Sequence, residues 1–454
     1  MIRKLLFHNF IIIYRISQWL RQHFTNTGAL LLSGLVAAAV FGLDTRQTLS
    51  YQIFALLLSI FMLAMFSVLV FRAKFRVIRN LPEYGTAGQT LEYEINVKNL
   101  GARNYSHVTL IDELTNDFPD YQQYITAADS LDRQRNLFDR WVGYPRLVSL
   151  IRKYRGGFIR PVEVDTIFAG ETVHKKMELI PVRRGYLQFS KTLIGRCDPF
   201  GLLRRFKKYD HKDSLLILPR LYDIPPVNLT GTRKYQHGGM SLASSVGDSE
   251  EFFSLRDYRP GDPMRAIHWM SYAKRGVPIV KEFQDEYFSR LGLVLDTFLG
   301  DRPDIIFEEA VSVAASIAAS TRQQDSLLDL IFINDKAYRF TAGRGLAGID
   351  NMLEILACVA SNPADDIDTL KNLLLEHSAN TSGFICVLLD WDEARQQLVR
   401  QLMDAGNPVM VFVISEAEIK DKTEDPMFTR PEHFRRLQTG KIQQSLTTAL
   451  GMAG

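Results

Sequence analysis

Charged and aromatic side chains alternate densely in one segment, Glu251 to Lys281, which reads EFFSLRDYRPGDPMRAIHWMSYAKRGVPIVK. Arginine guanidinium groups form paired hydrogen bonds with carboxylates, and aromatic rings pack on their planar faces. A solvated surface does not need so many rings, and a hydrophobic core does not need so many charges. The segment is therefore interpreted either as a structural network of ion pairs or as a surface that docks a partner. The residues assigned to it are Glu251, Phe252, Leu255, Arg256, Asp257, Tyr258, Pro260, Gly261, Asp262, Arg265, His268 and Trp269.

Catalytic chemistry finds little support in the same segment. His268 has charged neighbours and is of the type that acts as a general base, but a single histidine in such a network is more often a hydrogen-bonded structural group. Asp257 and Asp262 flank the Pro260-Gly261 turn, and nothing else in the sequence points to a two-carboxylate hydrolase site. The chain contains no Walker-type phosphate loop, no G-x-S-x-G and no HExxH. The sequence predicts a protein that is not an enzyme.

The pattern E-F-x-x-L-R-x-Y-x-P-G-D-x-x-R-x-I-x-W, from Glu251 to Trp269, resembles the signature of a bacterial family known as domain of unknown function 58. Two upstream pieces resemble the family as well: Arg183 to Tyr186, and Asp198-Pro-Phe-Gly-Leu202. The resemblance implies a membrane-anchored protein with a C-terminal domain similar to von Willebrand factor A. It also implies a partner, a MoxR-type AAA+ ATPase, and a role as an adaptor in assembly or envelope maintenance.

Composition narrows the classes of protein further. The chain has 454 residues, a net charge of +3 and 23% charged residues, which is enough length for several domains and too little positive charge for a dedicated nucleic-acid binder. Cys197, Cys358 and Cys386 are odd in number and contain no CxxC pair, so they form neither a disulfide framework nor a zinc site. Cys386 lies in an apolar run, where a small buried side chain is expected.

Residues 1–80 are predicted to be a membrane anchor, with transmembrane helices at about 28–43 and 51–71. Both runs are uncharged, and basic residues precede the first and follow the second. The positive-inside rule therefore predicts a protein of the bacterial inner (plasma) membrane, with both termini and the soluble domains on the cytoplasmic side. Residues 1–22 are expected to form an amphipathic helix at the bilayer surface. Buried core helices are the alternative for the two apolar runs.

Residues 81–220 are predicted to form a β domain, because apolar and polar residues alternate from Leu91 to Val97 and in several later runs. An immunoglobulin-like sandwich is the expected architecture. A helical insertion interrupts it at about 120–156, and the sequence assigns this insertion no function. Residues 221–290 carry the family signature described above.

Residues 291–454 alternate between apolar strands and amphipathic helices, which predicts an α/β domain with a mostly parallel sheet covered on both faces. A doubly wound sheet similar to von Willebrand factor A is expected. The fold class is thus α/β plus β, preceded by two transmembrane helices.

Metal binding is the rival function for this C-terminal domain. Asp296 and Asp390 each end a predicted strand, where open α/β sheets bind ligands, and together they are weak candidates for a Mg²⁺ site. The D-x-S-x-S pattern typical of such sites is lost, because Phe298 and Gly300 replace the two serines. Thr297 is one residue out of step and is expected to point elsewhere. Helix capping by the two carboxylates is the structural alternative.

The preferred function is therefore a non-enzymatic, membrane-anchored adaptor that contacts the lipid bilayer and a MoxR-type AAA+ ATPase, with no cofactor and no nucleic acid. Arginine and tryptophan, as at Arg256, Arg259, Arg265 and Trp269, often dominate the binding energy of interfaces. Two alternatives remain open. One is a metal-dependent ligand-binding or hydrolytic domain that uses Asp296 and Asp390, and the other is an envelope scaffold that binds through the β domain.

Overall fold

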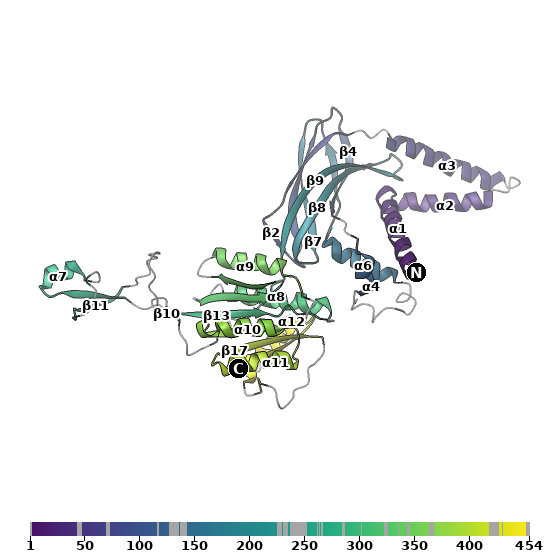
Figure 1. Ribbon diagram of the computed structural model, residues 1–454. Coiled ribbons are helices and arrows are strands. Elements are labelled where there is room, and N and C mark those ends of the chain that lie inside the picture. The colour runs from purple at the N-terminus through teal and green to yellow at the C-terminus, as the bar shows by residue number, and fades with distance from the viewer. Residues whose placement is uncertain are drawn as a thin grey trace. The chain divides into compact units, whose positions relative to one another are not determined.

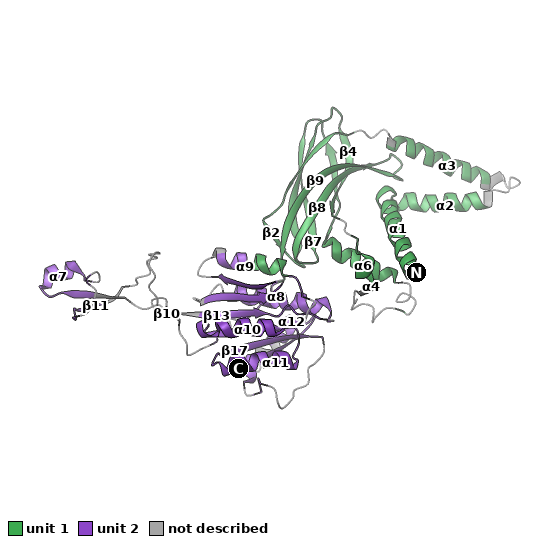
Figure 2. Ribbon diagram, viewed as in Figure 1, with its two compact units in different colours: residues 1–220, 353–359 green, residues 221–352, 360–454 purple. Residues whose placement is uncertain are grey.

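The computed structural model describes most of the chain. The residues described are 2–42, 48–69, 73–115, 118–126, 136, 143–224, 229, 235–236, 252–260, 262, 264, 267–283, 287–300, 302–321, 326–334, 336–342, 346–362, 367–416, 426–428 and 430–450. They divide into two compact units, residues 1–220 with 353–359, and residues 221–352 with 360–454 (Figure 2).

The first unit begins with three helices, α1 (Ile2–His23), α2 (Asn26–Gly42) and α3 (Thr48–Leu69), which Figure 1 shows in purple. The stretch Tyr51–Val68 of α3 is long and apolar enough to cross a bilayer by length and composition, whereas the apolar part of α2, Asn26–Val40, is shorter. Only 6% of the α3 stretch is buried, which argues against the alternative of a core helix. The first expected span, 28–43, corresponds to α2, a 17-residue helix that begins two residues earlier than predicted.

The β domain follows the three helices. Its elements are β1 (Phe75–Asn80), β2 (Tyr84–Thr86), β3 (Leu91–Asn99), β4 (Tyr105–Leu114), α4 (Tyr121–Thr126), α6 (Tyr144–Arg155), β5 (Gly157–Ile159), β6 (Val162–Ile167), β7 (Thr172–Pro181), β8 (Gly185–Cys197) and β9 (Arg204–Leu218). The strands form a four-stranded sheet in the order β1-β3-β7-β5 and a five-stranded sheet in the order β2-β9-β8-β4-β6. Both sheets contribute to one hydrophobic core, for example through Ile95 and Met177 from one sheet and Leu110 and Phe189 from the other. Alternating burial along β3 explains this packing, since every second side chain points into the core.

The insertion at 120–156 has a clear structural partner, although part of it lies outside the described residues. Its helices α4 and α6, with Phe118, pack on one face of α1 (Figure 1). Phe7 contacts the rings of Tyr121 and Tyr124, and Phe10 contacts Tyr144. The insertion therefore clamps the N-terminal helix against the β domain.

The second unit is an α/β domain with a mostly parallel sheet. Its elements are β10 (Tyr235–Gln236), β11 (Phe252–Asp257), α7 (Trp269–Arg275), β12 (Ile279–Phe283), β13 (Tyr287–Leu295), α8 (Asp304–Thr321), β14 (Ser326–Ile333), β15 (Ala337–Ala342), the first half of α9 (Leu346–Cys358), α10 (Ile367–His377), η3 (Ser378–Asn380), β16 (Gly383–Leu388), α11 (Glu393–Asp404), β17 (Val409–Ser415), η4 (Pro431–His433), β18 (Phe434–Gln438) and α12 (Ile442–Leu450).

The large sheet of this unit has the order β15-β14-β13-β16-β17-β18, with β10 also paired to β13. Strands β14, β13, β16, β17 and β18 run parallel, whereas the edge strand β15 is antiparallel. Every residue of β16 is buried, because helices cover both faces of the sheet. Cys386 lies on this strand, and burial raises the pKa of its thiol to about 12, so it remains a neutral core side chain. The immunoglobulin-like and von Willebrand factor A-like assignments stay predictions.

We expect Leu147→Ala to release α1 from the insertion. Leu147 is fully buried between α6 and α1, and loss of a buried leucine side chain typically costs about 2–5 kcal/mol. Amide hydrogen exchange in Ile2–His23 should accelerate, while exchange in β3 should not change. Arg152→Ala on the exposed face of α6 is the control, and unchanged protection of α1 in Leu147→Ala would contradict the clamp.

Candidate functional site

The signature segment folds as a small hairpin with its own two-stranded sheet. Strands β11 and β12 pair antiparallel, with Arg256 opposite Val280, and the connection between them contains α7. Ile279, Val280 and Ile267 are buried and form the small core of this element. We call residues 252–283 the signature hairpin.

One ion pair closes the connection of the signature hairpin back onto its strand. The guanidinium of Arg256 donates two parallel hydrogen bonds to the carboxylate of Asp262, at 2.7 and 2.8 Å. The backbone N–H of Arg259 donates to the same carboxylate at 2.8 Å. These hydrogen bonds lower the pKa of Asp262 to about 2. In the signature hairpin, the arginine fork of Arg256 therefore meets the carboxylate of Asp262.

Apolar side chains lie on the outside of the same hairpin. Trp269 is 58% exposed and Met270 is 78% exposed, although both belong to α7. The ring of Trp269 contacts Tyr272 edge-on, and Met264 is exposed as well. A two-stranded sheet with one short helix buries little apolar surface by itself, so these side chains form a patch that needs a covering surface.

The remaining predicted residues have mostly structural positions. Nδ1 of His268 lies 2.6 Å from the hydroxyl of Ser271, and the His268 N–H donates to the carbonyl of Ile279. The N–H of Tyr258 donates to the carbonyl of Pro278, and Leu255, Asp257 and Pro260 are exposed. Phe252 lies on β11, and the structure describes its backbone but not its side chain. Glu251, Gly261 and Arg265 lie outside the described residues.

At the position where the metal-site hypothesis places a cation, the structure has the guanidinium of Arg395. Asp296 follows β13 at the carboxyl end of the sheet, and its carboxylate accepts from Nε of Arg395 at 2.6 Å, with both side chains fully buried. The same carboxylate accepts from the N–H groups of Phe298 and Leu389. Thr297 donates its hydroxyl to the carbonyl of Ile333, as predicted, and so points elsewhere.

Asp390 is occupied in a similar way. Its carboxylate accepts from Nε and Nη2 of Arg302, at 3.1 and 2.9 Å. The helix-capping alternative is wrong for both candidates, because the side chain that caps α11 is Asp392, which accepts from the N–H of Arg395. Among the described residues, no group of three or more metal-binding side chains comes together. The donors at this edge of the sheet therefore do not fit a small hard cation.

A second polar centre lies in the β domain and connects its two sheets. Arg79 of β1 donates two hydrogen bonds to Asp112 of β4, at 2.8 and 2.6 Å, and both side chains are fully buried. Asp112 also accepts from the hydroxyls of Tyr93 and Thr192. Burial alone would lower the pKa of Arg79, but the hydrogen bonds and charges of Asp112 and Asp213 outweigh it and raise this pKa. Burial, with the charge of Asp112, strongly raises the pKa of Tyr93, so its phenol stays protonated.

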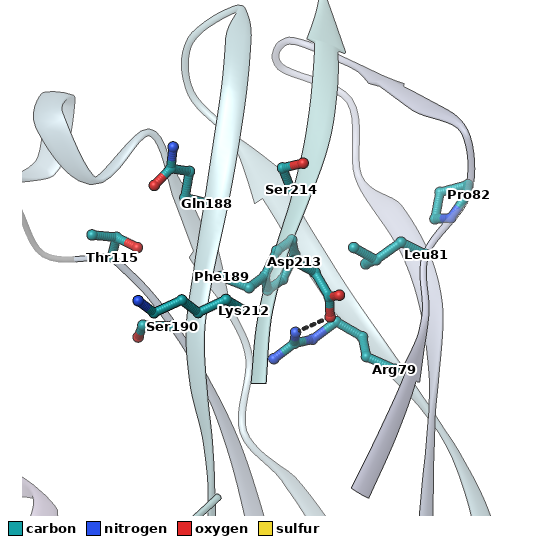
Figure 3. Close-up of a pocket in the computed structure, with 10 residues that line it drawn as sticks. All are labelled: Arg79, Leu81, Pro82, Thr115, Gln188, Phe189, Ser190, Lys212, Asp213 and Ser214. Atoms are coloured by element: carbon teal, nitrogen blue, oxygen red, sulfur yellow. Dashed lines mark hydrogen bonds and ion pairs between the residues drawn. The ribbon is translucent and has the colours of Figure 1, made fainter. Parts of the chain in front are cut away.

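A hollow of about 830 Å³ opens beside this centre (Figure 3). Arg79 and Phe189 lie at its base, with Asp213 held by Arg79 at 2.5 Å. Lys212 lines it and makes no hydrogen bond or ion pair with other described residues. Among the described residues, the hollow has one ammonium group without an ion-pair partner and several polar side chains, which suits an acidic or polar peptide better than an apolar ligand.

The buried pairs Arg79–Asp112 and Arg395–Asp296 were not predicted from the sequence. A signal existed for Arg79: on strand 75–80 it shares the inward face with Phe75 and Val77, so strict alternation places a charge in the core. For Arg395 no comparable signal exists, since the position of α11 against the end of β13 depends on tertiary packing.

The buried pair in the α/β domain gives a stability prediction. We expect Arg395→Met to destabilise the second unit by about 3–5 kcal/mol, because it leaves the Asp296 carboxylate buried without a counter-charge. Arg302→Met is the matched control, and should cost no more than about 1 kcal/mol because this pair is partly exposed. A urea titration followed by hydrogen exchange in Gly383–Leu388 measures both. Equal effects of the two variants would contradict this interpretation.

The Arg256–Asp262 pair gives a pH prediction. The pKa of Asp262 lies at about 2 in the folded hairpin, below its ordinary value of 3.8. A depressed pKa stabilises the folded form above the ordinary value, and this contribution is lost as pH falls through about 2. The protection factor of the Arg259 amide should therefore hold down to about pH 4 and fall below it. In Asp262→Asn this step should disappear, and a step that persists there would assign it to another group.

Comparisons with known proteins return an uncharacterized relative, distantly similar solved structures and a family model. An uncharacterized protein of Bacillus subtilis, YeaD, is 29% identical over 192 residues, which cover 42% of this chain and 46% of YeaD. The chain thus spans about half the length of this curated relative. Among solved structures, a PapD-like domain of human CEP192 is 13% identical and covers 32% of this chain and 85% of that chain, with a TM-score of 0.17. A β-glucosidase from Listeria innocua is 14% identical and covers 32% of this chain and 16% of that chain, with a TM-score of 0.16. At these TM-scores neither structure bears on fold or function.

One family model matches a continuous part of the chain that includes most of the signature hairpin and the sheet up to β17. The two upstream pieces of the resemblance, at 183–186 and 198–202, lie outside the matched range. The resemblance is confirmed to this extent: residues 254–418 match the family described as protein of unknown function DUF58.

Proposed function

We propose that this chain is a non-enzymatic, membrane-anchored interaction protein whose signature hairpin docks a protein partner. The observation that carries the proposal is the exposure of Trp269 and Met270 on a hairpin held in shape by the Arg256–Asp262 pair. A rigid element that presents an aromatic ring and a flexible thioether has the properties of an interface anchor.

Membrane anchoring is supported by the helices of the first unit. The apolar surface of α3 is almost entirely unburied. Helix α2 lies beside it, so that a Cβ atom added to Gly34 would be 4.0 Å from Cδ1 of Leu57. Such surface is unfavourable in water and favourable in lipid. Basic residues on both outer flanks orient the pair with the β domain and the α/β domain in the bacterial cytoplasm.

For the partner we propose a MoxR-type AAA+ ATPase, which the family resemblance implies. A ring ATPase works on other proteins, and a membrane-anchored hairpin would hold it near its substrates. In this proposal the adaptor supplies position and the ATPase supplies energy, so the adaptor itself needs neither a nucleotide site nor a metal.

A second candidate is a scaffold that binds through the β domain. It is favoured by the hollow beside Arg79, where Lys212 has no partner among the described residues. The two candidates differ in which unit carries the binding surface, and one experiment separates them.

We expect Trp269→Ala/Met270→Ala to lower the amount of AAA+ ATPase that co-purifies with the gently solubilised full-length chain by at least about tenfold, because truncating two anchors at an interface removes more than 1.4 kcal/mol of binding free energy. The measurement is quantitative mass spectrometry of the purified complex. Protection of the Arg259 amide shows in parallel that the hairpin is still folded.

Phe428→Ala is the control, since Phe428 is an exposed apolar ring of the same unit outside the hairpin. If the ATPase persists with Trp269→Ala/Met270→Ala but is lost with Lys212→Glu, the β-domain scaffold is the better description. If it persists with both variants, neither surface binds it.

A further inference from the structure

The turn between β8 and β9 is a built structure with an exposed ring at its tip. The carboxylate of Asp198 accepts hydrogen bonds from the N–H groups of Phe200, Leu202 and Leu203, at 2.9, 2.7 and 2.6 Å. Asp198 itself is buried, so its charge is used entirely to hold the turn. Phe200 is 51% exposed. Nothing in the signature hairpin or its docking function uses this turn.

The same turn is joined to the two apolar helices. Thr25 caps the start of α2: its hydroxyl accepts from the N–H of Gly28 and donates to the carbonyl of Gly201. The N–H of Thr25 donates to the carbonyl of Leu202 at 3.1 Å. At the other helix, Arg205 donates to the carbonyl of Val68, in the last turn of α3, at 3.0 Å. The turn therefore lies where both apolar helices meet the β domain.

Positive charge accumulates around this turn without being neutralised. Between residues 196 and 208 the only acidic residue is Asp198, and the basic residues are Arg196, Arg204, Arg205, Lys207 and Lys208. Arg196 lies directly opposite Arg205 in the β8–β9 ladder, a like-charge pair that is unfavourable by itself. Arg205 and Lys207 donate to neutral backbone carbonyls, which leave their charge uncompensated.

Three basic groups around the turn lack a partner among the described residues. Arg196 and Lys208 are exposed and form no ion pair with other described residues. Nε of Arg204 is buried without a hydrogen-bond partner among the described residues, which costs free energy unless an acceptor reaches it. Several phosphate groups would provide acceptors on both faces of the ladder, because arginine forks match phosphate oxygens in charge and geometry.

Helix α1 extends this surface. Its face toward the insertion is buried, whereas Leu5, Ile12, Ile13, Ile16 and Trp19 on the other side are exposed. In Figure 1, α1 runs crosswise to α2, and the two are joined at Phe24, which pairs with Leu203 beside the turn. A helix with an exposed apolar face, lying across the start of a spanning helix, occupies the plane of the bilayer surface.

We propose that the β8–β9 turn is a binding site for anionic phospholipid headgroups, with Phe200 immersed at the boundary between headgroups and acyl chains. Arg196, Arg204 and Lys208 bind the lipid phosphates, and the exposed face of α1 continues the contact. This inference rests on the proposed membrane anchor and adds a lipid-selective surface outside the spanning helices.

The test uses a tryptophan placed at the tip. Full-length Phe200→Trp is reconstituted into nanodiscs of phosphatidylcholine with a minor fraction of phosphatidylglycerol, and bromine quenchers are attached to the acyl chains of one lipid or the other. The native tryptophan signal is subtracted with the unmodified chain. We expect quenching by both lipids and, per molecule, about fivefold or more by phosphatidylglycerol, since each basic residue near an anionic surface contributes roughly that factor.

Matched variants separate the claims. Tyr84→Trp is the depth control, because Tyr84 is 47% exposed and pairs with Leu216, near the opposite end of β9 from the turn. It should not be quenched. Arg196→Ala/Lys208→Ala, made in the Phe200→Trp background, should bring the lipid preference close to one, whereas Lys176→Ala, whose side chain is paired with Glu92, should leave it unchanged.

If the Phe200→Trp chain stays in the nanodisc but its new tryptophan is not quenched, the lipid site is overturned and the membrane anchor still stands. Quenching without lipid preference would overturn the headgroup selectivity. A chain that alkaline carbonate washes from vesicles would instead overturn the anchor.

Discussion

A guanidinium–carboxylate pair without any solvent exposure stands inside each unit, and both units are organised around the need to keep it paired. Arg79 and Asp112 connect the two sheets of the β domain, and Arg395 and Asp296 connect α11 to the end of β13. A buried charge without its partner costs several kcal/mol, so each pair fixes the relative position of the elements that carry it. Hydroxyl groups and backbone N–H groups around both carboxylates satisfy their remaining lone pairs.

This use of charge explains where function is to be sought. In open α/β sheets, carboxylates at the strand ends often bind a ligand, but here Asp296 and Asp390 are paired with Arg395 and Arg302. In the β domain, Arg79 is paired with Asp112 and Asp213. The interior therefore holds rigid frames with little reactive chemistry. Among the described residues, the rings of the signature hairpin and the cations of the β8–β9 turn remain available for binding. Both elements are shaped by one aspartate that gathers backbone or guanidinium donors, Asp262 in the first and Asp198 in the second.

Local patterns predicted the elements well and their pairing poorly. Alternation from Leu91 to Val97 predicted strand β3, and the apolar strands predicted within residues 291–454 include β13, β14, β16 and β17. The Arg256–Asp262 pair was within reach as well, since both residues lie in one short motif. The partners of Asp296 and Asp390 were not, because Arg395 and Arg302 reach them only through the packing of helices on the sheet. The insertion could be recognised as helical, but its contact with α1 joins residues more than a hundred positions apart.

The cap of α2 has a consequence for the order in which the chain is made. Thr25 finds its acceptor at Gly201, 176 residues later, so the seat of the first apolar helix is incomplete until the β8–β9 turn has left the ribosome. During that interval α2 and α3 are already apolar enough to partition into lipid, while the β strands that contact them have not yet formed. Closing so long a loop is slow compared with forming a local helix. With the proposed membrane anchor, the bilayer, rather than the β domain, would be the first surface to hold this part of the nascent chain, and the protein would assemble its two units from an end already tethered.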